Sequence, residues 1–267
     1  MNNKLLKIIE FFWYGGIKSK RYKRIYNIIS IPFFIYVLMV LYPNLLFSYS
    51  VSYKNYTVFS NEVMEDHIYS ILDSVDKQLS TSDVYDNTIK HKIFISDNYK
   101  LYTFLSHMYY KTSGITYVFF NNHYITKSEI KNDVSIKNSE GYNKTSLTHV
   151  ITHESMHTLL QERLGLIKYL SLPKWMMEGY CEYISDDSIY DYDEGIEHLK
   201  TGKKDKSKSF NYFQYRIMVE YLFDVEKITF DDFVEKDFDF SGVELKMIES
   251  LRNSTQANLR LSRREKF

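Results

Sequence analysis

The sequence predicts an α+β protein in which a small sheet comes first, a mainly helical half follows, and one N-terminal transmembrane helix precedes both. Three observations predict this class. Residues 28–47 carry no charge, short strand-like segments occur between residues 56 and 126, and apolar residues recur at helical spacing after residue 146. With 267 residues, of which 44% are hydrophobic, the chain is long enough for one folded domain plus an appendage.

The apolar run of twenty residues, 28–47, is long enough to cross a hydrocarbon core as a helix. Residues 1–48 hold seven Lys or Arg against one Glu, and nearly all of these basic residues precede the run. The positive-inside rule then predicts a cytoplasmic basic segment at 1–26, a transmembrane anchor at 27–48 and an extracytoplasmic domain at 49–267 of a single-pass cell-membrane protein.

Two other interpretations of the apolar run were weighed. A cleaved signal peptide fits less well, because the basic region is long and residues 48–50 make a poor cleavage site. A buried core helix is disfavoured by the charges that flank the run. We therefore expect an uncleaved membrane anchor.

Overall charge and cysteine content narrow the functional class. The formal net charge is zero, which is not the profile of a nucleic-acid-binding protein, so we expect no nucleic-acid partner. The one cysteine, Cys181, excludes an intrachain disulfide. Cys181 could be a metal ligand, but it has no cysteine partner, and a small apolar core residue is the favoured interpretation.

The segments from residue 56 to residue 145 predict the sheet. Strands are expected at 56–59, 92–95, 115–120 and 124–126, and helices at 62–79 and 99–108. Residues 127–145 are polar and irregular and are expected to form a loop.

The sequence His153-Glu154-Ser155-Met156-His157 lies in a predicted helix that begins near Ser146 and ends before Gly165. Residues four apart lie on one helix face, so His153 and His157 can reach one metal ion together, while Glu154 lies beside it. Both His fall on the apolar stripe and face inward. A lone inward His is usually a core residue, but two at ligand spacing with a neighbouring Glu are hard to explain as packing.

A two-His site needs a third protein ligand. Glu178 follows His157 after twenty residues, within the stretch Trp175-Met176-Met177-Glu178-Gly179-Tyr180-Cys181-Glu182-Tyr183. Pro173 suits the first turn of a new helix, and the gap is long enough for that helix to return antiparallel to the first. Gly179 costs about 1 kcal/mol inside a helix, which is understandable where two helices approach closely.

Together, H-E-x-x-H and W-x-x-E-G-x-x-E-Y resemble the gluzincin zinc metallopeptidases, the superfamily of thermolysin and the alanyl-aminopeptidases, and most closely the small bacterial peptidase MA-like domains. The match covers residues 147–185. The spacing before the third ligand is slightly longer than usual, and no G-x-M-E-N stretch supports the aminopeptidase branch.

The resemblance implies a zincin fold and assigns residues to roles. His153, His157 and Glu178 would bind Zn²⁺, Glu154 would be the general base, and a peptide or protein would be the substrate. Glu182 would not bind the metal but would accept a hydrogen bond from His153 and so orient its ring. The alternative is that Glu182 is an exposed carboxylate on the helix surface. A strand near residues 124–126 would bind the substrate backbone.

Further along the chain the sequence is less specific. Residues 186–194 are acidic, and a solvated turn is favoured over a calcium loop; 203–208 is a second loop. A strong helix is expected at 210–223, with short helices from 230 and from 243. Tyr212 or Tyr215 on the strong helix is a candidate oxyanion donor, although two packed tyrosines would explain the same residues.

Two alternatives to a membrane-anchored metallopeptidase were considered. One is a non-catalytic binding or assembly module that retains the motif, against which the intact Glu154 counts. The other is an intramembrane metalloprotease, which is excluded because the H-E-x-x-H helix is not part of a twenty-residue apolar span.

Overall fold

The computed structural model describes residues 13–15, 17, 19–64, 66–139, 143–203 and 205–253. It divides into two compact units, residues 1–46 and 47–267, close to the predicted boundary at residue 48. Much of the predicted basic segment, together with the C-terminal residues 254–267 of the predicted domain, lies outside the described residues.

The first unit contains one long helix, α2, which spans Lys20–Leu41 and is followed by the short 3-10 helix η1, Pro43–Leu46. Helix α2 is long and apolar enough to cross a membrane, and few of its side chains are buried. The apolar run was expected to be helical from residue 28 to residue 47. The helix instead begins earlier, includes Pro32, and ends where Pro43 starts the 3-10 turn.

The second unit begins with a five-stranded sheet whose order is β1-β2-β3-β5-β4. Strands β2, β3 and β5 are parallel, whereas β1 and β4 run antiparallel to their neighbours at the two edges. The strands are β1 Tyr49–Tyr53, β2 Tyr56–Ser60, β3 His91–Ile95, β4 Gly114–Tyr117 and β5 Asn122–Ile125.

The sheet confirms the mixed α+β class and corrects two expectations. Strand β4 stops at Tyr117, because a 3-10 turn at Val118–Phe120 and a left-handed Asn121 reverse the chain. The segment expected to present an edge at residues 124–126 belongs to β5, which lies between β3 and β4. The edge strand next to the H-E-x-x-H helix is therefore β4. Strand β1 was not predicted, since its polar alternation leaves it largely exposed.

Residues 127–145, which were expected to form a loop, contain a small antiparallel sheet, β6-β7-β8. Its strands are too short and too polar to show an apolar alternation in the sequence. They are β6 Ser128–Glu129, β7 Val134–Ile136 and β8 Lys144–Ser146, with the 3-10 helix η3 at Ile130–Asn132.

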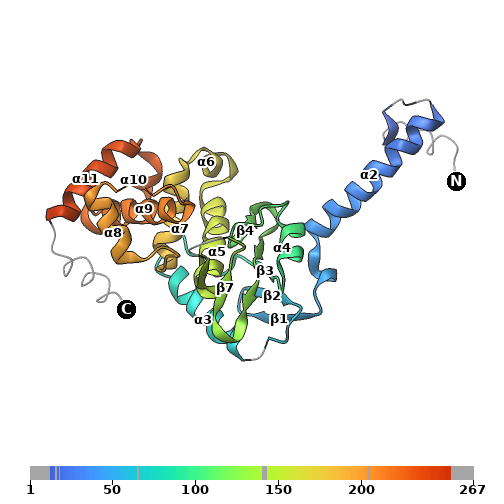
Figure 1. Ribbon diagram of the computed structural model, residues 1–267, viewed down its shortest axis with the longest axis horizontal. Coiled ribbons are helices and arrows are strands. Elements are labelled where there is room, and N and C mark those ends of the chain that lie inside the picture. The colour runs from blue at the N-terminus through green and yellow to red at the C-terminus, as the bar shows by residue number, and fades with distance from the viewer. Residues whose placement is uncertain are drawn as a thin grey trace. The chain divides into compact units, whose positions relative to one another are not determined.

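Helix α5, Leu147–Leu164, is the central element of the second unit (Figure 1). Strands β1–β5 lie on one side of it and helices α7–α11 on the other. An apolar stripe was predicted, but every residue from Leu147 to Leu160 is buried, so the helix is enclosed on all sides. Ser146 caps its first turn and Gly165, with φ 73°, ends it, as predicted.

The remaining helices largely follow the predicted segments. Helix α3 begins five residues later than expected, and α11 is longer than the short helix expected from residue 243. The bounds are α3 His67–Leu79, α4 Tyr99–Leu105, α6 Leu166–Ser171, α7 Lys174–Ser185, α8 Tyr192–Thr201, α9 Lys208–Glu220, the π-helix η4 Tyr221–Val225, α10 Phe230–Glu235 and α11 Phe240–Asn253.

Helix α8 begins inside the acidic stretch 186–194, which was expected to be a solvated turn. Asp191 caps the helix by accepting a hydrogen bond from the Glu194 backbone N–H at 2.8 Å. Asp193 and Glu194 then lie in the first turn, where carboxylates interact favourably with the helix dipole. The acidic residues therefore start a helix.

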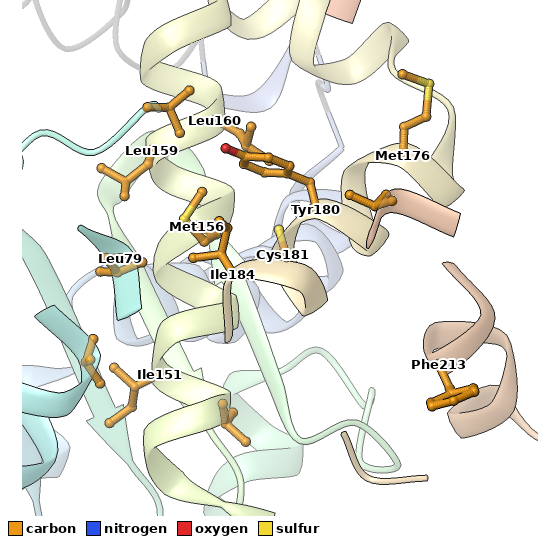
Figure 2. Close-up of a cluster of buried hydrophobic side chains, with 14 of the residues drawn as sticks. Leu79, Ile151, Met156, Leu159, Leu160, Met176, Tyr180, Cys181, Ile184 and Phe213 are labelled. Atoms are coloured by element: carbon orange, nitrogen blue, oxygen red, sulfur yellow. The ribbon is translucent and has the colours of Figure 1, made fainter. Parts of the chain in front are cut away.

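Apolar side chains of α5 and α7 form the part of the core that lies behind the H-E-x-x-H residues and Glu178. Figure 2 shows Tyr180, Cys181 and Ile184 of α7 pointing towards Met156 and Leu160 of α5, and all five are buried. Cys181 is fully buried, as expected for a small core residue. This packing sets the distance between the two helices.

Gly179 allows α7 to approach α9 closely. A Cβ atom added at this position would lie 2.6 Å from the backbone oxygen of Tyr215 and 2.8 Å from a methyl group of Val219. The close approach expected from the glycine therefore involves α9, on the side of α7 away from the H-E-x-x-H helix.

We expect Gly179→Ala to lower the free energy of unfolding by about 1–3 kcal/mol, because α7 must move away from the α9 backbone. Urea unfolding followed by circular dichroism measures this. Gly242→Ala is the matched control, since its new Cβ would be 3.4 Å from the nearest atom, Asp239 Oδ2, and alanine favours a helix. Equal stability of Gly179→Ala and the wild type would contradict the close approach.

Candidate metal centre

Helix α5 places His153 and His157 one turn apart, both buried, with ring centroids separated by 5.0 Å. Helix α7 brings Glu178 against them. Glu178 Oε2 lies 3.3 Å from His153 Nε2 and 3.6 Å from His157 Nε2. The two ring nitrogens that face α7 therefore converge on one carboxylate oxygen.

These separations fit a shared metal ion. A tetrahedral zinc site with bonds of about 2.0–2.1 Å places its ligand atoms about 3.3–3.4 Å apart. Two imidazole nitrogens and one carboxylate oxygen are also a usual ligand set of a catalytic zinc, with the fourth position left for water. The two separations from Glu178 are thus close to those that a shared zinc ion would need.

The pKa shifts of His153 and Glu178 also indicate that a positive charge is favoured between these two side chains. Burial opposes charge on His153, but Glu178 and Glu182 outweigh it and hold the pKa of that imidazole well above its usual range. Burial likewise opposes charge on Glu178, but His153 and His157 hold its pKa well below the usual range. A positive charge is therefore stabilised between His153 Nε2 and Glu178, where a metal ion would replace the proton.

Glu182 lies one turn beyond Glu178 on α7 and is turned inward. Its Oε1 is 3.0 Å from His153 Nδ1, the nitrogen on the far side of the ring from Glu178. Its Oε2 is 3.7 Å from His149 Nε2. The carboxylate is buried, so the exposed alternative does not apply, and it can hold the ring of His153 in one orientation.

His157 is held at its own Nδ1 by two groups that sequence reasoning did not connect with it. The Tyr169 hydroxyl of α6 is 3.1 Å away, and Cys181 Sγ is 3.6 Å away. Tyr169 lies in a short helix that was not predicted, and a contact between these residues has no signature in sequence spacing.

Two groups of side chains, neither of which contains Glu178, bring three ligand atoms within 4.8 Å of one another: His153, His157 and Cys181, and His149, His153 and Glu182. We favour Glu178 as the third ligand over both. Cys181 is fully buried, and burial raises the pKa of its thiol well above the usual range, which disfavours the thiolate that metal binding needs. Glu182 faces the opposite edge of His153 from Glu178.

Glu154 lines the same pocket and points towards the edge strand β4. The Thr116 hydroxyl of β4 is 2.5 Å from Glu154 Oε2. Gly114 of the same strand leaves room for Glu154 Oε1, since a Cβ at position 114 would overlap that oxygen. Burial raises the pKa of Glu154, against the opposing effects of His157, His153 and the Thr116 hydrogen bond.

Thr116 connects Glu154 to two buried histidines in the sheet. Thr116 Oγ1 is 3.0 Å from His123 Nδ1, its cross-strand partner in β5, and His123 Nε2 is 3.0 Å from His91 Nδ1 in β3. A hydroxyl has one hydrogen, so when Thr116 donates to Glu154, His123 must donate to Thr116 and His91 to His123. Both His91 and His123 are buried in the core.

The three candidate ligands line a pocket of about 350 Å³. One wall is β4 with the residues that precede it, and other walls come from α5, α7 and the start of α9. His149 also lines it. His149 was not selected from the sequence, although it lies four residues before His153 and so shares the face of both ligands.

The two candidate tyrosines of α9 differ in their positions. Tyr212 lines the pocket, and its ring centroid is 6.2 Å from that of His153. Tyr215 packs edge-on against Phe240 of α11 and is not among the described residues that line the pocket. The expectation for Tyr215 is therefore corrected, because the next turn of α9 faces the helical core.

In comparisons with known proteins, no family model, no curated protein and no solved structure matches this chain. The functional argument therefore depends on the geometry of the site.

We expect Glu182→Ala to weaken zinc binding by roughly 10–100-fold without unfolding the protein, because His153 loses the carboxylate that orients it. Competition with a chromophoric chelator measures the affinity. Glu162→Ala, an exposed carboxylate on α5, is the control and should bind zinc normally. Wild-type affinity in the Glu182 variant would remove it from the metal centre.

Proposed function

We propose that this protein is a membrane-anchored zinc metallopeptidase of the gluzincin type. The observation that carries the proposal is the approach of Glu178 Oε2 to the Nε2 atoms of His153 and His157, at 3.3 and 3.6 Å, inside a pocket that also holds Glu154. Metal-assisted hydrolysis needs two imidazoles and one carboxylate as metal ligands, and a second carboxylate beside them that does not bind the metal.

His153, His157 and Glu178 would hold the zinc. When bound, zinc lowers the pKa of water and polarises a carbonyl group. Glu182 and Tyr169 orient the two imidazoles from behind, so that both Nε2 atoms stay directed at the same point.

Glu154 is the proposed general base. The Thr116 hydroxyl occupies Oε2, which leaves Oε1, beside Gly114, to accept a proton from water and deliver it to the leaving amine. Burial raises the pKa of this carboxyl, which makes it a stronger base than an exposed glutamate. The His123–His91 pair keeps the Thr116 hydroxyl directed at Glu154.

The substrate backbone would lie along β4. This strand replaces residues 124–126 as the proposed docking edge, because β4 is the free edge of the sheet and its residues Gly114–Thr116 line the pocket. An extended peptide added there would pass Glu154 Oε1 and the metal ligands.

Tyr212 is the proposed donor to the oxyanion of the tetrahedral intermediate. Burial, with the nearby Glu178 and Glu182 carboxylates, raises its pKa, so the phenol keeps its proton. A protonated phenol in the pocket can donate a hydrogen bond as negative charge develops.

Helix α2 would anchor the peptidase in the cell membrane. Basic residues cluster before the uncharged run, four of them in the first turns of α2, and the proposed catalytic residues follow the helix. The proposed topology therefore places the N-terminus in the cytoplasm and the peptidase domain outside.

Glu154→Gln should abolish peptide hydrolysis and retain one zinc per chain, because the amide keeps the shape of the side chain but cannot accept the proton. Metal analysis of the purified protein and cleavage of a fluorogenic peptide library measure the two properties. Unchanged hydrolysis in the variant would remove Glu154 from the mechanism. A zinc-loaded wild type that cleaves no peptide would favour a non-catalytic binding module.

Cysteine labelling tests the topology. Cys181 is fully buried, so an introduced Glu62→Cys provides an accessible thiol after α2, and a membrane-impermeant maleimide should label it in intact cells. Ser19→Cys, before α2, is the matched variant and should react only after lysis. The reverse pattern would invert the orientation.

A further inference from the structure

The charges around the pocket are unevenly distributed. The only carboxylates among the described lining residues are Glu154, Glu178 and Glu182, and each is already engaged by a histidine or by Thr116. Four lysines line the same pocket, and among the described residues none of them forms an ion pair: Lys111, Lys137, Lys174 and Lys208. The pocket therefore presents unpaired positive charge to a ligand.

Lys137 is the most constrained of these lysines. It follows β7, and its backbone N–H donates to the Asn143 carbonyl at 2.9 Å, which fixes the start of its side chain. The side chain is partly buried, and its Nζ donates to the Ser209 hydroxyl at 2.9 Å. Burial lowers the pKa of Lys137. The Glu182 carboxylate opposes this effect, but Glu182 also lies against His153 and His149, and Lys208 adds a second positive charge. The hydrogen-bond partner of the ammonium group is a neutral hydroxyl, so an anion in the pocket would stabilise it further.

Other polar groups gather at the same end of the pocket. Lys208 and Ser209 are the first two residues of α9, whose N-terminus favours negative charge. The buried ring of His149 also lines the pocket, and its Nδ1 has no hydrogen-bond partner among the described residues. This nitrogen is therefore free to form a hydrogen bond with a bound ligand.

We propose that Lys137, Lys208 and Ser209 form a subsite for a carboxylate of the peptide substrate, so that the protein acts on acidic peptides. This proposal rests on the proposed peptidase function and specifies its substrate class. The carboxylate can come from an Asp or Glu side chain or from the C-terminus of the peptide. A hydrogen-bonded charge pair of this kind contributes roughly 10- to 100-fold in affinity.

The test uses the full-length protein in detergent and a series of peptides based on one cleaved sequence, with Glu or Gln at each position in turn and with a free or amidated C-terminus. Wild-type kcat/KM should be roughly 10- to 100-fold higher for one acidic version, and the pair of versions that differs identifies the source of the carboxylate. In Lys137→Gln the preference should fall to within about threefold, and Lys137→Glu should prefer a Lys-containing peptide.

Lys131→Gln, an exposed lysine on the 3-10 helix η3, is the control and should keep the wild-type preference. Lys208→Gln removes an exposed charge of the subsite and should reduce the preference without affecting folding, which guards against misfolding of the Lys137 variants. A second readout is independent of the metal. Fluorescence anisotropy of labelled peptides with zinc-free Glu154→Gln protein should show the same preference for the acidic version.

The outcomes separate the two proposals. Equal cleavage of acidic and neutral versions, or a preference that survives in Lys137→Gln, would overturn the subsite and leave the peptidase proposal standing. If the zinc-loaded protein cleaves no peptide, the peptidase proposal fails. Binding to the zinc-free protein then decides the subsite, which is overturned if acidic and neutral peptides bind equally.

Discussion

The close approach of Glu178 to two imidazole nitrogens is the interaction on which the rest of the second unit depends. Charged groups lose their hydration when they are buried, and each must be compensated by a partner. Here the carboxylates of α7 and the histidines of α5 compensate one another, at 3.0 Å between Glu182 and His153 and at 3.3 Å between Glu178 and His153. Removing one partner would leave a buried charge unpaired, which typically costs about 3–5 kcal/mol.

The position of α5 follows from this requirement. Residues Leu147–Leu160 of the helix are buried on every side because they contact three things at once: the apolar core shared with α3 and α7, the carboxylates of α7, and the edge strand β4. Glu154 turns towards β4 while His153 and His157 turn towards α7. The pocket is therefore the boundary between the sheet and the helical part: the helices supply the proposed base and ligands, and β4 supplies the Thr116 hydroxyl that contacts Glu154.

The features that could be predicted from the sequence are those with local spacing. His153, His157 and Glu182 were selected because residues four apart share a helix face, and the strands β2 and β3 because they are short apolar runs. The edge position of β4 was missed, because strand order depends on tertiary pairing and the segments 115–120 and 124–126 have similar composition. The contact of Thr116 with Glu154 joins residues 38 positions apart, and no local pattern records it. His149 was missed for another reason. It lies four residues before His153 and so shares its helix face, but the H-E-x-x-H motif needs only two histidines, so the third was not selected.

The close packing of Gly179 against the Tyr215 carbonyl has a consequence for the order in which the site can form during synthesis. Helix α7 carries Glu178, and its close support comes from α9, Lys208–Glu220, which is synthesised later. While a nascent chain ends before residue 208, both histidines and Glu178 have been made, but the surface that holds α7 in place has not. The cluster can reach its final geometry only after α9 has been synthesised. Until then, the proposed metal ligands of the growing chain are present but are not held together.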